Sequence, residues 1–357
     1  MQKKRVEFLT QFMNTICPTG YEEEAARVWR KEASSFADRA WIDVQGNAIA
    51  AINESASFRV MIAGHLDEIG LMITYVDDRG YLSFTGLGGW DLAILPGQRA
   101  RIRTAAGTVL GVIGRKPIHL MKEEDRKSLP RFEDLWIDIG AKSKAEALDL
   151  VALGDPAVLD YGTAELRDGI LVGRGFDDRI GAFVALEALR LLKEKGTRLG
   201  VYAVATVQEE IGSRGAQTSA FGIDPQVGIA IDVGFCTDYP GMDEAKKKWG
   251  EVNLRGGPIL TRGPNANPQL YKRFSEAAKK HKIPFQVEPY PRGTGTDGNV
   301  IQLARGGVAT AIVSIPNRYM HSPCEIVHLD DVENAAKLIA HTVAAMTAKT
   351  TFVGEEI

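Results

Sequence analysis

Cysteine is scarce in this sequence, with only three residues, Cys17, Cys236 and Cys324, among 357. Their odd number and uneven spacing exclude a disulfide framework of the kind that stabilises small secreted domains. The cysteine content therefore favours a reducing compartment.

An excess of charge of one sign is also missing, because 43 lysines and arginines stand against 46 aspartates and glutamates, a formal net charge of −3. This balance gives no indication of nucleic acid or a membrane as a partner. No apolar run reaches the roughly 18 residues of a membrane-spanning helix. The basic start, Met-Gln-Lys-Lys-Arg, is not followed by a signal-peptide segment. We therefore expect a cytoplasmic protein.

What the sequence contains is a two-part pattern. Strand-like apolar runs alternate with amphipathic helices in residues 1–68 and again in residues 169–357, which predicts a catalytic α/β domain. Its sheet should be mixed, mostly parallel and covered by helices. Residues 69–168 contain short alternating runs separated by turn signals, which predicts an inserted small β-barrel. Within this insert, the strongly charged stretch 121–134 is expected to be an exposed loop.

Apolar spacing predicts the individual elements. Helices are expected near residues 2–16, 19–33, 142–151, 177–195, 268–280, 297–305 and 330–348. The strands of the α/β domain are expected near residues 41–44, 46–53, 58–63, 199–207, 227–233, 285–287 and 308–315.

The chain is organised around Thr206-Val-Gln-Glu-Glu-Ile-Gly-Ser-Arg-Gly215. Glu209 and Glu210 come directly after an apolar strand, where the alternation of side chains ends and both can reach one cavity. Two buried carboxylates need a cation to stabilise them. The alternative, a surface pair at the start of a helix, is the more common explanation of an isolated Glu-Glu.

Other polar residues also stand where apolar strands end or helices begin: His65, Asp67, Asp177, Asp178, Asp232 and His321. In open α/β sheets this edge is where ligand sites form. Each residue alone has an ordinary structural explanation, such as helix capping for the Asp pair. Together, two imidazoles and three carboxylates are a set that holds two divalent ions with a shared water between them. A further unligated carboxylate is needed to transfer the proton.

Six ordered motifs resemble the M42 family of metallo-aminopeptidases over essentially the whole chain. They are His65-Leu-Asp-Glu-Ile-Gly70, Phe176-Asp-Asp-Arg-Ile-Gly181, Glu209-Glu-Ile-Gly-Ser-Arg-Gly215, Ile231-Asp-Val-Gly234, Gly295-Thr-Asp297 and Met320-His-Ser322.

This resemblance implies a role for each polar residue. One metal ion is expected on His65 and Asp232, the other on Glu210 and His321, and Asp177 bridges them. Asp177 is preferred to Asp178 because related binuclear peptidases use the acid that precedes a variable Asp or Asn. Asp67 is expected to orient His65 through a hydrogen bond from the imidazole to its carboxylate, and Glu209 to be the general base. The resemblance also implies a tetrahedral dodecamer assembled through the inserted domain 69–168, which gates access so that only short peptides enter.

The predicted function is a metal-dependent aminopeptidase that removes N-terminal residues from short peptides by means of a bridging hydroxide. The ions would be zinc or cobalt, with manganese as a further option. Alternatives are a deacylase or carboxypeptidase of the same binuclear architecture, a non-catalytic metal-binding scaffold, or a metal-independent glycan hydrolase. Candidate substrate-binding residues are Arg292, Gly295, Thr296 and Asp297. Arg292 or a lysine among residues 246–248 could bind an acidic side chain, although each is more commonly a surface charge.

Overall fold

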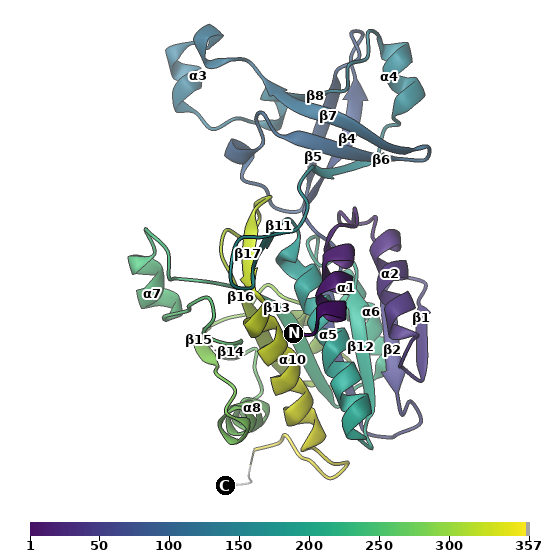
Figure 1. Cartoon of the computed structure of the whole chain (residues 1–357), viewed down its shortest axis with the longest axis vertical. Helices are drawn as coiled ribbons and strands as arrows, with labels where there is room; N and C mark the ends of the chain where they lie inside the picture. The colour runs from purple at the N-terminus through teal and green to yellow at the C-terminus, as the bar shows by residue number, and fades with distance from the viewer. Residues whose placement is uncertain (355–357) are drawn as a thin grey trace.

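The computed structural model describes residues 1–354 and has two parts, an α/β body and a smaller β-rich unit stacked on it (Figure 1). An eight-stranded mixed sheet, in the order β1-β2-β12-β3-β13-β16-β14-β15, forms the centre of the body. Its strands are β1 (Arg39–Ile42), β2 (Ala48–Ile52), β3 (Arg59–His65), β12 (Gly200–Thr206), β13 (Val227–Phe235), β14 (Ile259–Arg262), β15 (Gln286–Pro289) and β16 (Ala309–Asn317). The four adjacent strands β12, β3, β13 and β16 are parallel, so their carboxyl ends meet at one edge of the sheet.

Helices cover both faces of this sheet, because side chains of the central strands β2, β12, β3, β13 and β16 alternate between two apolar clusters. Val60 and Ile62 of β3 belong to the larger cluster, whereas Met61 and Ala63 belong to the smaller one. The larger cluster is completed by α1 (Lys3–Met13), α2 (Glu23–Ala33), α5 (Phe176–Lys195), α8 (Pro268–His281) and α10 (Leu329–Ala344). The smaller one is completed by α6 (Arg214–Ile223) and α9 (Gly298–Ile301).

The inserted segment forms a closed barrel with the strand order β4-β5-β8-β7-β6-β9. The strands are β4 (Gly70–Val76), β5 (Leu82–Leu87), β6 (Arg99–Thr104), β7 (Gly107–Arg115), β8 (Leu135–Asp138) and β9 (Pro156–Leu159), with α4 (Lys144–Leu150) beside them. The barrel has its own apolar core, which includes Leu71, Phe84 and Ile102. The predicted fold class, an α/β sheet with an inserted small barrel, is confirmed.

A small sheet lies where the chain returns from the barrel to the body. It consists of β10 (Ala164–Glu165), β11 (Ile170–Gly173) and β17 (Glu325–His328). The charged stretch 121–134 is largely exposed, as predicted, and contains the short helix α3 (Glu123–Lys127).

Most predicted elements occur within a few residues of their expected bounds, but helices α3, α6 and α7 (Asp243–Trp249) and strand β14 were not anticipated. The helix expected at residues 297–305 is reduced to the single turn of α9. Among the described residues, no helix combines the length and the apolar character needed to cross a membrane.

Candidate active site

The predicted ligands converge at the carboxyl edge of the parallel strands. His65 is the last residue of β3, and Asp232 lies near the end of β13. Glu210 follows β12, Asp177 is in the first turn of α5, and His321 follows β16. Because β12, β3, β13 and β16 are parallel neighbours, residues that are far apart in sequence meet here.

The ligand atoms fall into two groups that share one residue. His65, Asp177 and Asp232 form the first group, and Asp177, Glu210 and His321 form the second; within each, the candidate ligand atoms lie within 4.8 Å of one another. One oxygen of Asp177 is 3.2 Å from His65 Nε2, and the other is 3.3 Å from His321 Nε2. Asp177 therefore stands between the two imidazoles, in the position of a bridging carboxylate.

The donor set fits two divalent cations. Glu210 Oε1 is buried without a hydrogen-bond partner in the described chain, although His321 Nε2 lies 3.5 Å away. Burial and the nearby carboxyl groups raise the pKa of Glu209 to about 9 and that of Glu210 to about 7. A hydrogen bond with Asp177 raises the pKa of His321 to about 9. The cluster contains more carboxyl groups than its two imidazoles can neutralise, and buried excess negative charge favours cation binding.

Both histidines are held by backbone carbonyl groups. His65 Nδ1 lies 2.9 Å from the carbonyl oxygen of Asp67, and His321 Nδ1 lies 2.9 Å from that of Gly89. When Nδ1 donates to a carbonyl, the proton is fixed on that nitrogen and Nε2 keeps its lone pair. Both Nε2 atoms point towards Asp177.

The Asp67 carboxylate contacts different atoms from those expected. Its nearest oxygen is 3.6 Å from His65 Nδ1, which is too long for a hydrogen bond. Instead, the carboxylate accepts hydrogen bonds from the backbone N–H groups of Glu209 at 3.0 Å and Glu210 at 3.1 Å. Asp67 thus orients His65 through its main chain and fixes the Glu-Glu turn through its side chain.

Glu209 lies beside the two ligand groups but belongs to neither. Its Oε2 is 3.9 Å from His65 Nε2, and Ser213 Oγ is 3.3 Å from Oε1. Glu209 is therefore a carboxyl group within reach of the candidate ligands that is not itself one of them.

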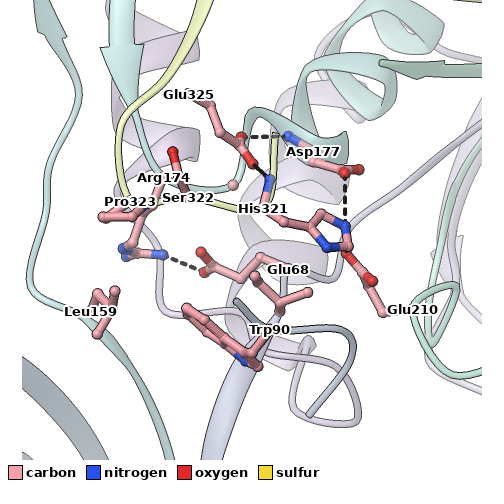
Figure 2. A pocket seen from close by; sticks show the side chains of 12 residues that line it. Glu68, Trp90, Leu159, Arg174, Asp177, Glu210, His321, Ser322, Pro323 and Glu325 are labelled. Carbon is pink, nitrogen blue, oxygen red and sulfur yellow. Dashed lines mark hydrogen bonds and ion pairs between the residues drawn. The ribbon is translucent and has the colours of Figure 1, made fainter. Parts of the chain in front are cut away.

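Two buried carboxylates, Asp178 and Glu325, hold the backbone of the ligands; the sequence offered Asp178 as the alternative to Asp177 but did not indicate Glu325. Asp178 accepts from the N–H of His65 at 3.1 Å and is not in either ligand group. Glu325 accepts from the N–H of Asp177 at 2.9 Å and from that of His321 at 3.1 Å, as Figure 2 shows. Glu325 is an acid four residues after His321, but no spacing rule distinguishes it from a surface residue.

A buried ion cluster lies under the same site. Glu68 accepts hydrogen bonds from Arg174, as Figure 2 shows, and from Arg179. All three side chains are almost fully buried. Glu68 precedes the inserted barrel, and Arg174 follows it. The two points where the chain passes between body and barrel are therefore joined.

The four candidate substrate residues have different positions. Gly295 and Thr296 line a cleft of about 610 Å³ that opens beside the ligand groups. Asp297 is buried and accepts a hydrogen bond from Thr206. Arg292 is exposed and is not part of the cleft lining.

Residues 46–338 match the family model described as M42 glutamyl aminopeptidase. The chain belongs to this family. The M42 assignment identifies it as a peptidase of the aminopeptidase type, as the six motifs predicted.

Named relatives of this M42 chain agree with the assignment. The lysyl aminopeptidase of Pyrococcus furiosus is 41% identical over 335 residues, which cover 93% of this chain and 94% of the relative. The TET aminopeptidase of the Thaumarchaeota archaeon SCGC AB-539-E09 is 34% identical with a TM-score of 0.91, covering 97% of this chain and 98% of that structure. The TET1 peptidase of Pyrococcus horikoshii, which can assemble into a tetrahedron or a large octahedral shell, is 34% identical with a TM-score of 0.85, covering 96% and 100%.

Proposed function

We propose that this protein is a metal-dependent aminopeptidase that removes N-terminal residues from short peptides. The observation that supports this best is the position of Asp177 between the two ligand groups, with Glu209 beside them and unligated. A scaffold that merely binds metal would need the ligands but no free carboxyl group.

The residues that would hold the ions are His65 and Asp232 for one, Glu210 and His321 for the other, and Asp177 for both. Zinc, cobalt and manganese all suit this mixture of imidazole and carboxylate donors. When bound, two such ions supply an activated water and polarise the scissile carbonyl group.

Glu209 performs the proton transfer. Nearby positive charge lowers the pKa of a carboxyl group, so Glu209 becomes a carboxylate when the site is loaded. It accepts the proton of the attacking water and donates it to the leaving amine. The hydrogen bonds from the Glu209 and Glu210 N–H groups to Asp67 keep this carboxyl group beside His65 during both transfers.

Glu209, which belongs to neither ligand group, also favours the free α-amino end of a peptide. Its carboxylate attracts an ammonium group and repels a C-terminal carboxylate. This asymmetry favours an aminopeptidase over a carboxypeptidase of the same architecture.

We also propose that residues 69–168 are a separate domain that mediates self-association into a dodecamer. Large apolar side chains are exposed on it, among them Leu110, Val112, Ile118, Leu120 and Leu129. The shell formed by the Pyrococcus horikoshii relative agrees with this role. The scarcity of cysteine supports a reducing, cytoplasmic location.

The function can be tested with one unmodified peptide and one metal series. The protein is stripped with a chelator and reloaded with zinc, cobalt or manganese, and the products are followed by mass spectrometry. We expect stepwise loss of N-terminal residues, two metal ions per chain by elemental analysis, and no turnover of the stripped protein. Loss from the C-terminal end, or full activity with one ion or none, would contradict the proposal.

A further inference from the structure

Two polar residues that precede helices beside the candidate metal site do not cap those helices. Ser213 precedes α6 and Asp297 precedes α9, and both residue types are favoured there because their side chains accept from the first N–H groups of a helix. Neither side chain makes that hydrogen bond in the described part of the chain. At α9, Thr296 takes the role instead, since its hydroxyl group accepts from the Gly298 N–H at 3.2 Å. The side chains of Ser213 and Asp297 are therefore available for other contacts.

The Ser213 hydroxyl group contacts the proposed general base. The turn after Glu209 brings the two residues together, because the N–H groups of Gly212 and Ser213 both donate to the Glu209 carbonyl oxygen, at 2.9 and 3.0 Å. Ser213 has a φ of +50°, in the left-handed region that serine rarely adopts. Its Oγ donates to Glu209 Oε1 at a distance of 3.3 Å. An uncommon backbone conformation thus accompanies the contact with the Glu209 side chain.

Asp297 lies behind this pair of residues. It is 2% exposed and does not line the cleft, whereas Glu209 and Ser213 both do. Asp297 Oδ2 accepts a hydrogen bond from the Thr206 hydroxyl group, and Oδ1 is buried without a partner of normal geometry among residues 1–354. Burial raises the pKa of Asp297 to about 6, and the hydroxyl groups of Thr206 and Ser213 both lower it. Ser213 is therefore within interaction range of this carboxyl group, and Oδ1 is open to it.

A hydroxyl group between two carboxyl groups is able to hold both. Serine Oγ has one proton to donate and two lone pairs that accept. It can donate to a Glu209 carboxylate and accept from a protonated Glu209, so the contact survives proton transfer in either direction. Thr206, the fully buried last residue of β12, fixes Asp297 at the other end of the chain of contacts. The Glu209 side chain is thus linked to the central sheet in both of its protonation states.

We propose that Asp297 is a positioning residue that holds the Glu209 carboxyl group in place through the Ser213 hydroxyl group. This inference rests on the proposed aminopeptidase function and deepens it, because it gives the Gly295-Thr-Asp297 motif a role other than substrate binding. In the described chain, Asp297 neither lines the cleft nor belongs to a ligand group. Its loss should therefore slow proton transfer while substrate affinity and metal content are kept.

The test measures kcat, KM and metal content of the reloaded protein with the most readily cleaved member of an amino-acid p-nitroanilide panel. Asp297→Ala should lower kcat by about 10- to 100-fold, the scale of a misplaced catalytic group, with KM within about 3-fold of the wild type. Two metal ions per chain should remain bound. Asp297→Asn keeps an acceptor for Thr206 and a polar group facing Ser213, so its kcat should exceed that of Asp297→Ala by at least about 5-fold.

A double-mutant cycle tests the route through Ser213. Ser213→Ala should lower kcat about as much as Asp297→Ala, and the double variant should lose no more than either single variant, because both changes break one chain of contacts. Ser219→Ala is the matched control, since it also removes a buried hydroxyl group, one that donates to backbone carbonyl groups of α6. It should leave kcat unchanged and should not alter the effect of Asp297→Ala. Multiplied losses in the double variant, or a loss in KM or metal content instead of kcat, would overturn the inference.

Crystal structures of the metal-free variants give a readout that does not depend on activity. In Asp297→Ala, the Glu209 side chain should leave its contact with Ser213 Oγ, whereas the wild type and Ser219→Ala should keep this contact near 3.3 Å. An unchanged Glu209 conformer in Asp297→Ala would count against the positioning role. If Asp297→Ala fails to fold, as judged by its melting curve, Thr206→Val removes the contact that fixes Asp297 and should displace Glu209 in the same way. If the reloaded wild type cleaves no p-nitroanilide, the aminopeptidase proposal fails, and a displaced Glu209 would still support the link to Asp297.

Discussion

His321 Nδ1 lies 2.9 Å from the carbonyl oxygen of Gly89, and this hydrogen bond connects the inserted segment to the candidate metal site. His321 comes from the α/β body, whereas Gly89 follows barrel strand β5. The insert therefore completes the orientation of a ligand, although no side chain from the barrel strands enters either ligand group in the described chain.

The first prediction concerns the glycine beside Gly89. Gly88 has a φ of +80°, and a Cβ there would lie 2.8 Å from Ile69 Cγ2 and 3.2 Å from Glu210 Oε2. Gly88→Ala should displace Glu210 and lower affinity for the second metal ion by about 10- to 100-fold, the range seen when the surroundings of a ligand are disturbed. Metal titration by calorimetry measures this change.

Gly97→Ala is the control, since Gly97 has a similar φ of +84° but open space around it. Both variants carry the same backbone strain, so only Gly88→Ala should change metal affinity. Equal effects in the two variants would show that strain, and not contact with Glu210, is responsible.

The second prediction distinguishes the two halves of the Glu-Glu pair. Glu209→Gln keeps the size of the side chain but cannot accept a proton, so kcat should fall by about 10² or more while both metal ions remain bound. Glu210→Gln removes a charged ligand, so metal affinity should fall first and excess metal should restore part of the activity. Metal content and turnover are measured together for each variant, and the reverse pattern would exchange the two roles.

The third prediction concerns Glu325, which accepts hydrogen bonds from the backbone of two ligands. Glu325→Gln keeps the shape but replaces one acceptor oxygen with a donor that faces an N–H group. We expect metal affinity to fall by about 10- to 100-fold, with partial recovery of kcat at saturating metal. Glu276→Gln, an exposed carboxyl group on α8, should bind metal like the wild type. Loss of activity without loss of metal would contradict this positioning role.

The fourth prediction concerns stability at acidic pH. The rings of His281 on α8 and His341 on α10 are stacked with centroids 3.6 Å apart. Burial, together with the positive groups Lys195, His281, Lys280 and Lys337, lowers the pKa of His341 below its ordinary value. The folded protein therefore favours the neutral ring, and this contribution to stability is present above the unfolded pKa of about 6.5 and is lost as the pH falls below it.

Urea unfolding at pH 7.5 and pH 5.5 tests this expectation. The midpoint should fall more between these pH values in the wild type than in His341→Gln. His119→Gln, on an exposed turn of the insert, should retain the wild-type pH dependence. An unchanged pH dependence in His341→Gln would refute the prediction.

The candidate ligands that the structure brings together could be selected from the sequence because they share a local signal. His65 and Asp232 are polar residues at the ends of apolar strands, and parallel strands bring such ends together. The Gly89 carbonyl group could not be predicted, since every residue has one and only the fold selects it. Glu325 lies in a short strand of a small sheet, where no periodicity marks its carboxylate as part of a site.

Two further differences have identifiable physical causes. Helix α6 was missed because its sequence, Arg-Gly-Ala-Gln-Thr-Ser-Ala-Phe-Gly-Ile, is rich in residues with low helix propensity. Packing of Ala216 and Ala220 against the sheet stabilises it instead. The spacing of His65 and Asp67 placed the two side chains together correctly but could not show that the carboxylate turns towards the Glu209 and Glu210 N–H groups.

The ion cluster of Glu68, Arg174 and Arg179 ties together the two chain segments that connect the inserted barrel to the α/β body. Removing one partner of a buried ion pair costs about 3–5 kcal/mol. The two connecting segments therefore stay joined when distant parts of the insert change. Cleavage or lengthening within residues 122–129, which are exposed, is therefore expected to leave the ion cluster and the Gly89 contact unchanged. The few residues next to β5 that contact the site are thus expected to tolerate substitution less well than these exposed residues.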